Sequence, residues 1–175
     1  MRVLFASIKL FGFAMLCLVF FMSSLIWYPL TKNKHVYFLL PQTAYKIVCF
    51  IFGIRVRTSG TISKDHVFFI GNHLSYIDIP VLGTMIPGFF IAKEDVKSWP
   101  VLGLIVKLAG TIFIKRNKSA VTESKERILG RLSKGQSLIF FPEGTSSDGT
   151  TILPFKTSIF DIFLDDETKI QLQPF

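Results

Sequence analysis

Residues 67–78 read Val-Phe-Phe-Ile-Gly-Asn-His-Leu-Ser-Tyr-Ile-Asp, an apolar run followed directly by polar side chains. A short apolar run that ends at a glycine is typical of a buried strand. Similar runs occupy residues 89–91, 111–114 and 138–141, and a weaker one occupies residues 170–172. Helical patterns lie between them, at residues 77–86, 100–109, 119–134 and 155–164. This alternation predicts an α/β fold with a mixed, largely buried sheet flanked by helices.

The N-terminal part of the chain is predicted to enter a membrane. No charged residue lies between Leu10 and Thr31, and a helix of that length reaches roughly 33 Å, enough for a bilayer core of about 30 Å. Trp27 and Tyr28 lie near its far end, where interfacial aromatic residues concentrate. A signal peptide is the alternative, but it needs a shorter apolar region followed by a small-residue cleavage site. We therefore expect a retained anchor.

A second apolar stretch, residues 36–54, is interrupted by Pro41 and Lys46. Such a stretch suits a re-entrant or interfacial helix better than a simple span. We therefore expect residues 1–54 to form a membrane anchor, either one span or a helical hairpin. Residues 55–175 are expected to form the folded domain. Basic residues flank the first stretch about equally on both sides, so the charge pattern leaves the orientation open.

The composition is half hydrophobic, with a mean hydropathy of +0.47 and a formal net charge of +8. Much of the basic surplus falls within residues 115–134, which a solvated helix face explains. Nucleic acid is not expected as a partner, because no interleaved aromatic and basic stripe accompanies these charges. Neither Cys17 nor Cys49 has zinc or disulfide spacing, and His35 and His66 stand isolated. No metal site is therefore predicted.

His73 directly follows the strand predicted at residues 67–70, and Asp78 lies five residues later. Catalytic groups in α/β folds commonly follow strand ends. A carboxylate beside a histidine fixes its tautomer, and the imidazole can then take a proton from a substrate hydroxyl. A histidine and an aspartate at this spacing are also compatible with capping or core roles, so the pair is weak evidence alone.

Two further sites follow strands. The sequence Phe-Pro-Glu-Gly-Thr at residues 141–145 follows the strand at 138–141; its loop amides could bind an anion, and an ordinary turn is the alternative. Arg116 follows the strand at 111–114, and its planar guanidinium matches phosphate oxygens. An exposed strand-end arginine explains Arg116 equally well on its own. Nucleophile-elbow, Walker-type and dinucleotide-binding glycine motifs do not occur in the sequence.

These segments together resemble the glycerolipid acyltransferase family, which includes the 1-acylglycerol-3-phosphate acyltransferases. Four blocks occur in the order found in that family, from about residue 56 to the end. They are Asn-His-Leu-Ser-Tyr-Ile-Asp at 72–78, Gly-Thr-Ile-Phe-Ile-Lys-Arg at 110–116, Phe-Pro-Glu-Gly-Thr at 141–145 and Gln-Pro at 173–174. Each block is modest alone, whereas four in order are highly specific.

The resemblance implies a glycerol-3-phosphate acyltransferase-like fold and acyl transfer to the sn-2 hydroxyl of lysophosphatidic acid in phospholipid biosynthesis. Acyl-CoA or acyl-carrier protein would be the acyl donor and substrate, with no cofactor and no metal. It further implies a place at the cell inner membrane, with the catalytic domain on the cytoplasmic side. His73 would be the general base and Asp78 would orient it. The substrate-binding residues implied by the resemblance are Arg116, Glu143, Gly144, Thr145 and Lys93.

The sequence also departs from the family pattern. The family often has an arginine after Glu-Gly-Thr, where this chain has Ser146, and this change could alter the preferred head group. The chain ends inside or just after the fourth block, where family members usually continue, so a C-terminally truncated form is expected. The alternatives are therefore an acyltransferase for another lysolipid acceptor, or an inactive membrane-associated remnant.

Overall fold

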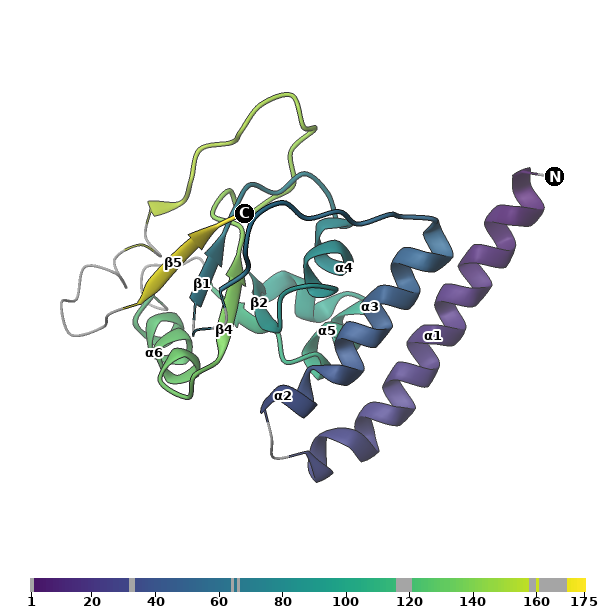
Figure 1. Cartoon of the computed structure of the whole chain (residues 1–175), viewed down its shortest axis with the longest axis horizontal. Helices are drawn as coiled ribbons and strands as arrows, with labels where there is room; N and C mark the ends of the chain where they lie inside the picture. Colours follow the sequence, from purple (N-terminus) through teal and green to yellow (C-terminus); the bar gives the residue numbers. More distant parts are fainter. Residues whose placement is uncertain are drawn as a thin grey trace. The chain divides into compact units, whose positions relative to one another are not determined.

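The computed structural model describes residues 2–31, 34–63, 65, 67–115, 121–157, 160 and 170–175. The chain divides into two compact units (Figure 1). Residues 1–60 and 79–87 form the first, and residues 61–78 and 88–175 form the second. The boundary expected after residue 54 stays a prediction, although the segment 79–87 belongs with the N-terminal unit.

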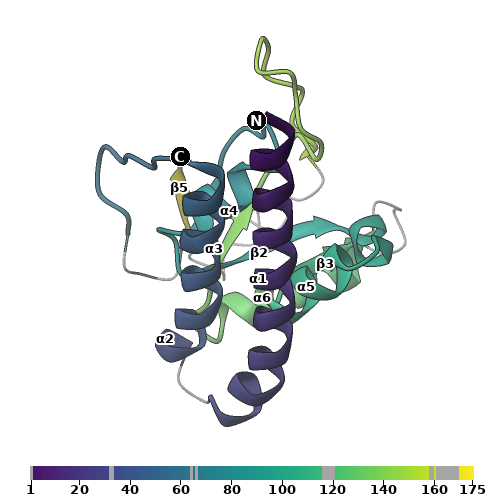
Figure 2. The same ribbon diagram turned by 90° about the vertical axis from the view of Figure 1, so that its right-hand side faces the viewer.

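The first unit is built on two helices that lie side by side, α1 (Arg2–Leu30) and α3 (Leu39–Phe52), with the short α2 (Lys34–Tyr37) before α3 (Figures 1 and 2). Pro41 lies in the first turn of α3, where a missing N–H costs no helical hydrogen bond. Gly53 ends α3 with a φ of 73°, and the N–H of Ile54 bonds back to the Cys49 oxygen at 2.8 Å. This left-handed ending is a Schellman-type cap, which satisfies carbonyls at the helix end.

Helix α1 is long and apolar enough to cross a membrane, with a mean hydropathy of 2.3 in its most apolar window. Only 6% of that window is buried inside the protein, so its side chains are free to contact lipid. The uncharged segment predicted from residue 10 is therefore helical, and the helix extends further toward the N-terminus than the charge pattern indicated.

The short helix α4 (Asp78–Gly83) covers only part of the helix predicted at residues 77–86.

The second unit contains a five-stranded sheet among its described residues, in the order β3-β2-β4-β1-β5. The strands are β1 (Val67–Ile70), β2 (Gly88–Lys93), β3 (Ile112–Ile114), β4 (Ser137–Phe140) and β5 (Gln171–Pro174). All described pairings are parallel, where the sequence led us to expect a mixed sheet. The physical reason is the connectivity: each strand is separated from its sheet neighbours by a long stretch of sequence, and among the described residues no tight hairpin joins neighbouring strands.

The core of this unit lies on the central strands. Phe68 of β1, and Leu138 and Ile139 of β4, are fully buried, which explains why these strands read as unbroken apolar runs. Helix α6 (Val121–Leu132) packs on β3 and β4 and buries Ile128 completely. The chain from β2 continues into a 3₁₀ helix, η1 (Glu94–Ser98), and then into α5 (Leu102–Leu108). The helix predicted at 155–164 falls mostly outside the described residues.

Replacing Gly130 by alanine is expected to stabilise the protein. Gly130 lies inside α6, where glycine costs about 1 kcal/mol relative to alanine, and a Cβ there would meet no atom within 4 Å. The Gly130→Ala variant should therefore gain about 0.5–1 kcal/mol and show a higher melting temperature in detergent solution. A lower melting temperature would contradict the open space on this face of α6.

Candidate active site

Three of the predicted site residues lie at the carboxyl ends of neighbouring strands. His73 follows β1, Glu143 follows β4, and Lys93 is the last residue of β2. Because β2, β4 and β1 are parallel neighbours, their carboxyl ends share one edge of the sheet. This edge is where open α/β sheets place their ligand sites. Arg116 lies outside the described residues, so its predicted role stays a prediction.

His73 and Asp78 are hydrogen-bonded through their side chains. Asp78 Oδ2 lies 2.8 Å from His73 Nδ1. The His73 side chain is 12% exposed and the Asp78 side chain is 23% exposed. The same oxygen accepts the backbone N–H groups of Leu74 at 2.8 Å and Ser75 at 3.0 Å. The loop thus wraps around the carboxylate of Asp78. In the neutral imidazole, donation from Nδ1 to this carboxylate places the proton on Nδ1 and leaves the lone pair on Nε2.

The loop after β4 holds His73 from three directions. The Phe141 ring stacks on the imidazole, with ring centroids 4.1 Å apart and an angle of 18° between the planes. Glu143 Oε1 accepts the backbone N–H of His73 at 3.1 Å, and the N–H of Ser147 donates to the His73 oxygen at 2.8 Å. Sequence reasoning assigned no role to Phe141 or Ser147, because Phe141 has no polar group and Ser147 contacts His73 only through its backbone N–H. Both residues contact His73 because the pairing of β1 with β4 places the loop after β4 beside it, and this pairing is known only from the structure.

The predicted substrate-binding residues of this loop differ in accessibility. Glu143 is 2% exposed, and its Oε2 is buried with no hydrogen-bond partner among the residues that the structure describes. Thr145 is exposed, and Gly144 is partly exposed. Gly144 has a φ of 67°, a left-handed conformation that favours glycine, and its N–H closes the turn onto the Phe141 oxygen at 3.0 Å. Gly144 and Thr145 can therefore meet a ligand, whereas the Glu143 carboxylate faces the protein.

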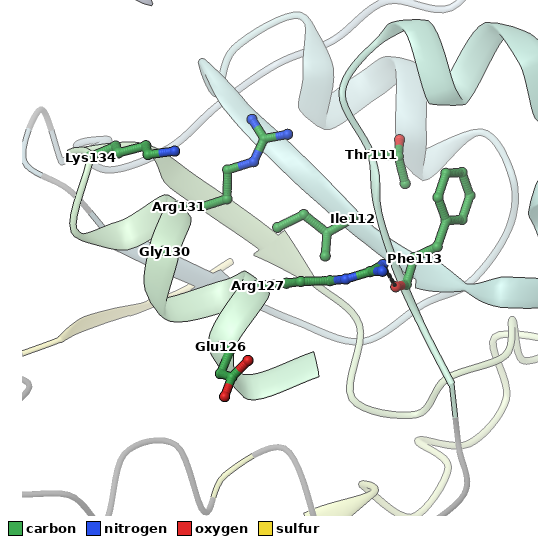
Figure 3. A pocket seen from close by; sticks show the side chains of 8 residues that line it. All are labelled: Thr111, Ile112, Phe113, Glu126, Arg127, Gly130, Arg131 and Lys134. Atoms are coloured by element: carbon green, nitrogen blue, oxygen red, sulfur yellow. Dashed lines mark hydrogen bonds between the residues drawn. The ribbon is translucent and has the colours of Figure 1, made fainter. Parts of the chain in front are cut away.

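A different part of this unit has a basic cavity of about 320 Å³, lined by Thr111, Ile112, Phe113, Glu126, Arg127, Gly130, Arg131 and Lys134 (Figure 3). Arg127 reaches from α6 to the carbonyl oxygen of Phe113 at 3.4 Å and pairs with Glu123 at 2.7 Å. Arg131 bonds Gln136 at 3.1 Å and lies over the Phe89 ring at 4.2 Å. These contacts tie α6 to the sheet, so two of the basic residues in this region have structural partners.

The family model described as Acyltransferase matches residues 53–175, which include every part of this site. The chain belongs to the acyltransferase family. The most similar relatives include a lyso-ornithine lipid O-acyltransferase of Rhizobium meliloti (strain 1021), 38% identical over 123 residues, which are 69% of this chain and 42% of that protein. A 1-acyl-sn-glycerol-3-phosphate acyltransferase of Neisseria meningitidis is 38% identical over 119 residues, 67% of this chain and 47% of that protein.

The chain also has a solved structural neighbour, the 1-acyl-sn-glycerophosphate (LPA) acyltransferase PlsC from Thermotoga maritima. The TM-score is 0.66 at 21% sequence identity, and the match covers 94% of this chain and 73% of that one. The likeness confirms the predicted fold class, an α/β sheet flanked by helices with an N-terminal apolar segment. The chain spans less than half the length of the curated relatives described above. Its long apolar helix and its lipid acyltransferase relatives indicate membrane association.

Proposed function

We propose that this acyltransferase moves an acyl group from a thioester donor, acyl-CoA or acyl-carrier protein, to a hydroxyl of a lysophospholipid. The observation that carries the proposal is the hydrogen bond between His73 Nδ1 and Asp78, which in the neutral imidazole leaves Nε2 with a lone pair. Family membership supports the same chemistry. Such a histidine suits proton removal from an alcohol, the step that activates the acceptor.

In the proposed mechanism, Nε2 of His73 takes the proton of the acceptor hydroxyl while its oxygen attacks the thioester carbonyl. Asp78 stabilises the imidazolium that forms. The tetrahedral intermediate collapses by breaking the C–S bond, and the departing thiolate receives the proton from the imidazolium. The products are the acylated lipid and a free thiol. No acyl-enzyme forms on this route, because the acceptor oxygen attacks the donor directly.

Lysophosphatidic acid is the acceptor we propose first, with its sn-2 hydroxyl as the nucleophile and phosphatidic acid as the product. Lys93 at the end of β2, Arg116, the partly exposed Gly144 and the exposed Thr145 would bind its phosphate, because cations and hydroxyl groups are phosphate ligands. The catalytic unit would lie on the cytoplasmic side of the cell inner membrane, where both thioester donors are available.

A lyso-ornithine lipid is the second candidate acceptor. Two relatives with this name, from Rhizobium meliloti and Brucella abortus, are 38% and 39% identical to the chain. The serine at position 146, where the resemblance leads one to expect an arginine, removes a cation that would attract phosphate. The two acceptors differ in their head groups, which are a phosphate in one and an ornithine in the other. An assay that offers each lipid separately therefore distinguishes them.

Membranes carrying the chain should transfer a labelled acyl group from acyl-CoA or acyl-carrier protein to a lysolipid. Lysophosphatidic acid, lyso-ornithine lipid and lysophosphatidylcholine would be offered separately, with membranes carrying His73→Ala as the matched control. We expect incorporation into lysophosphatidic acid that depends on His73. Preference for lyso-ornithine lipid would select the second acceptor. Equal incorporation with the His73→Ala membranes, or none with any acceptor from folded protein, would refute the proposed activity.

A further inference from the structure

The buried carboxylate of Glu143 is poorly placed to bind substrate. Its side chain is 2% exposed, so an acceptor lipid reaches it only after the loop opens. A carboxylate also repels a phosphate group, since like charges disfavour each other at close range. Burying a carboxylate is costly unless hydrogen bonds compensate for the lost water. The contact that Glu143 makes must therefore be sought inside the protein.

That contact is the backbone of the catalytic histidine. Glu143 Oε1 accepts the N–H of His73 at 3.1 Å, across 70 residues of sequence. The same loop grips the His73 carbonyl through the N–H of Ser147, and its Phe141 ring lies flat against the imidazole. His73 is thus fixed at its N–H, its carbonyl and one ring face by one loop, and at Nδ1 by Asp78.

We propose that Glu143 is a positioning residue for His73 and does not bind the acceptor. This inference rests on the proposed acyl transfer. Proton removal by Nε2 needs the imidazole within about 0.5 Å of its productive position. A charge-assisted hydrogen bond to the backbone N–H holds the start of the loop that carries the imidazole. Removing the Glu143 carboxylate leaves the His73 N–H without its hydrogen-bond partner, and the loop from β4 then holds His73 only through Ser147 and Phe141.

Two substitutions separate positioning from substrate contact. Glu143→Leu removes the acceptor atom, whereas Glu143→Gln keeps an oxygen for the His73 N–H and removes only the charge. We expect Glu143→Leu to lower kcat by about 10²-fold, the cost of a small misplacement, with the acceptor KM within about threefold of wild type. Glu143→Gln should retain kcat to within about tenfold, because its hydrogen bond is weaker but still formed. The exposed Glu126 on α6 supplies the matched control, Glu126→Gln.

A readout without turnover tests the same idea. The sequence has three histidines, so His35→Asn and His66→Asn leave His73 alone to be observed by ¹⁵N NMR of the full chain in detergent micelles. We expect one set of ring signals with the proton on Nδ1, preserved in Glu143→Gln and shifted or split in Glu143→Leu. This measurement decides the positioning role even if no acyl transfer is detected, in which case the proposed function fails separately.

Two results would overturn the positioning role. One is a change of acceptor KM beyond about threefold with kcat unchanged in Glu143→Gln, as a substrate contact requires. The other is an unaltered His73 ring spectrum in Glu143→Leu. If Glu143→Leu does not fold, Glu143→Gln still decides, because a substrate contact predicts a changed KM and a positioning contact does not.

Discussion

Asp78→Asn is expected to lower kcat by about 10³-fold, within the range that removal of general-base assistance covers. Three donors converge on Oδ2 of Asp78: the imidazole Nδ1 and the backbone N–H groups of Leu74 and Ser75. They should draw the asparagine oxygen into the same place, so the loop keeps its shape. What is lost is the negative charge that stabilises the imidazolium as the acceptor hydroxyl loses its proton. The KM for the acceptor should change little.

The measurement is the initial rate of acyl transfer at saturating acceptor, normalised to the amount of folded protein. Asp95→Asn is the matched control, because Asp95 is an exposed carboxylate in η1. The control should retain the wild-type rate. A kcat of Asp78→Asn within tenfold of wild type would mean that the charge of this carboxylate does not assist His73.

Gly103→Ala is expected to destabilise the fold strongly. Gly103 is buried in α5, and a Cβ there would overlap the carbonyl oxygen of Lys97 and lie 2.9 Å from that of Val96. Both carbonyl oxygens belong to the backbone of η1, so neither can move aside by a side-chain rotation. Overpacking of this kind costs about 3 kcal/mol, which lowers the melting temperature of a domain of this size by about 6–12 °C.

Thermal unfolding of the full chain in detergent, followed by circular dichroism, measures the effect. Gly130→Ala makes the same chemical change on α6, where nothing lies within 4 Å, and should raise the melting temperature. The two variants are therefore expected to move in opposite directions. Similar melting temperatures for both would show that α5 and η1 separate without cost.

Much of the second unit could be predicted from local sequence. Apolar runs marked the strands because buried parallel strands have no polar face, and β1 and β4 lie at those runs. The pairing of His73 with Asp78 could also be anticipated, since five residues of one loop bring the two side chains together. The sheet order could not, because pairings such as Phe68 with Leu138 are set by the packing of the whole sheet.

The supports of the site were hidden from sequence reasoning for the same reason. Glu143 reads as a polar loop residue until the pairing of β1 and β4 shows that its carboxylate is buried against the His73 backbone. Ser147 contributes only a backbone N–H, which every residue except proline has. Phe141 looks like the last residue of an apolar run, and its stacking on His73 becomes visible only in three dimensions.

The pairing of β1 with β4 also sets when the site can form during biosynthesis. Glu143 is made 70 residues after His73, and the segment between them contains β2, which lies on the other side of β4 in the finished sheet. Sheets with such non-local contacts fold slowly, because a long loop must close before the contacts stabilise it. A nascent chain that has reached only β3 carries His73 and Asp78 without the loop that grips them. Catalytic competence is therefore expected to appear late, after α6 and β4 have left the ribosome.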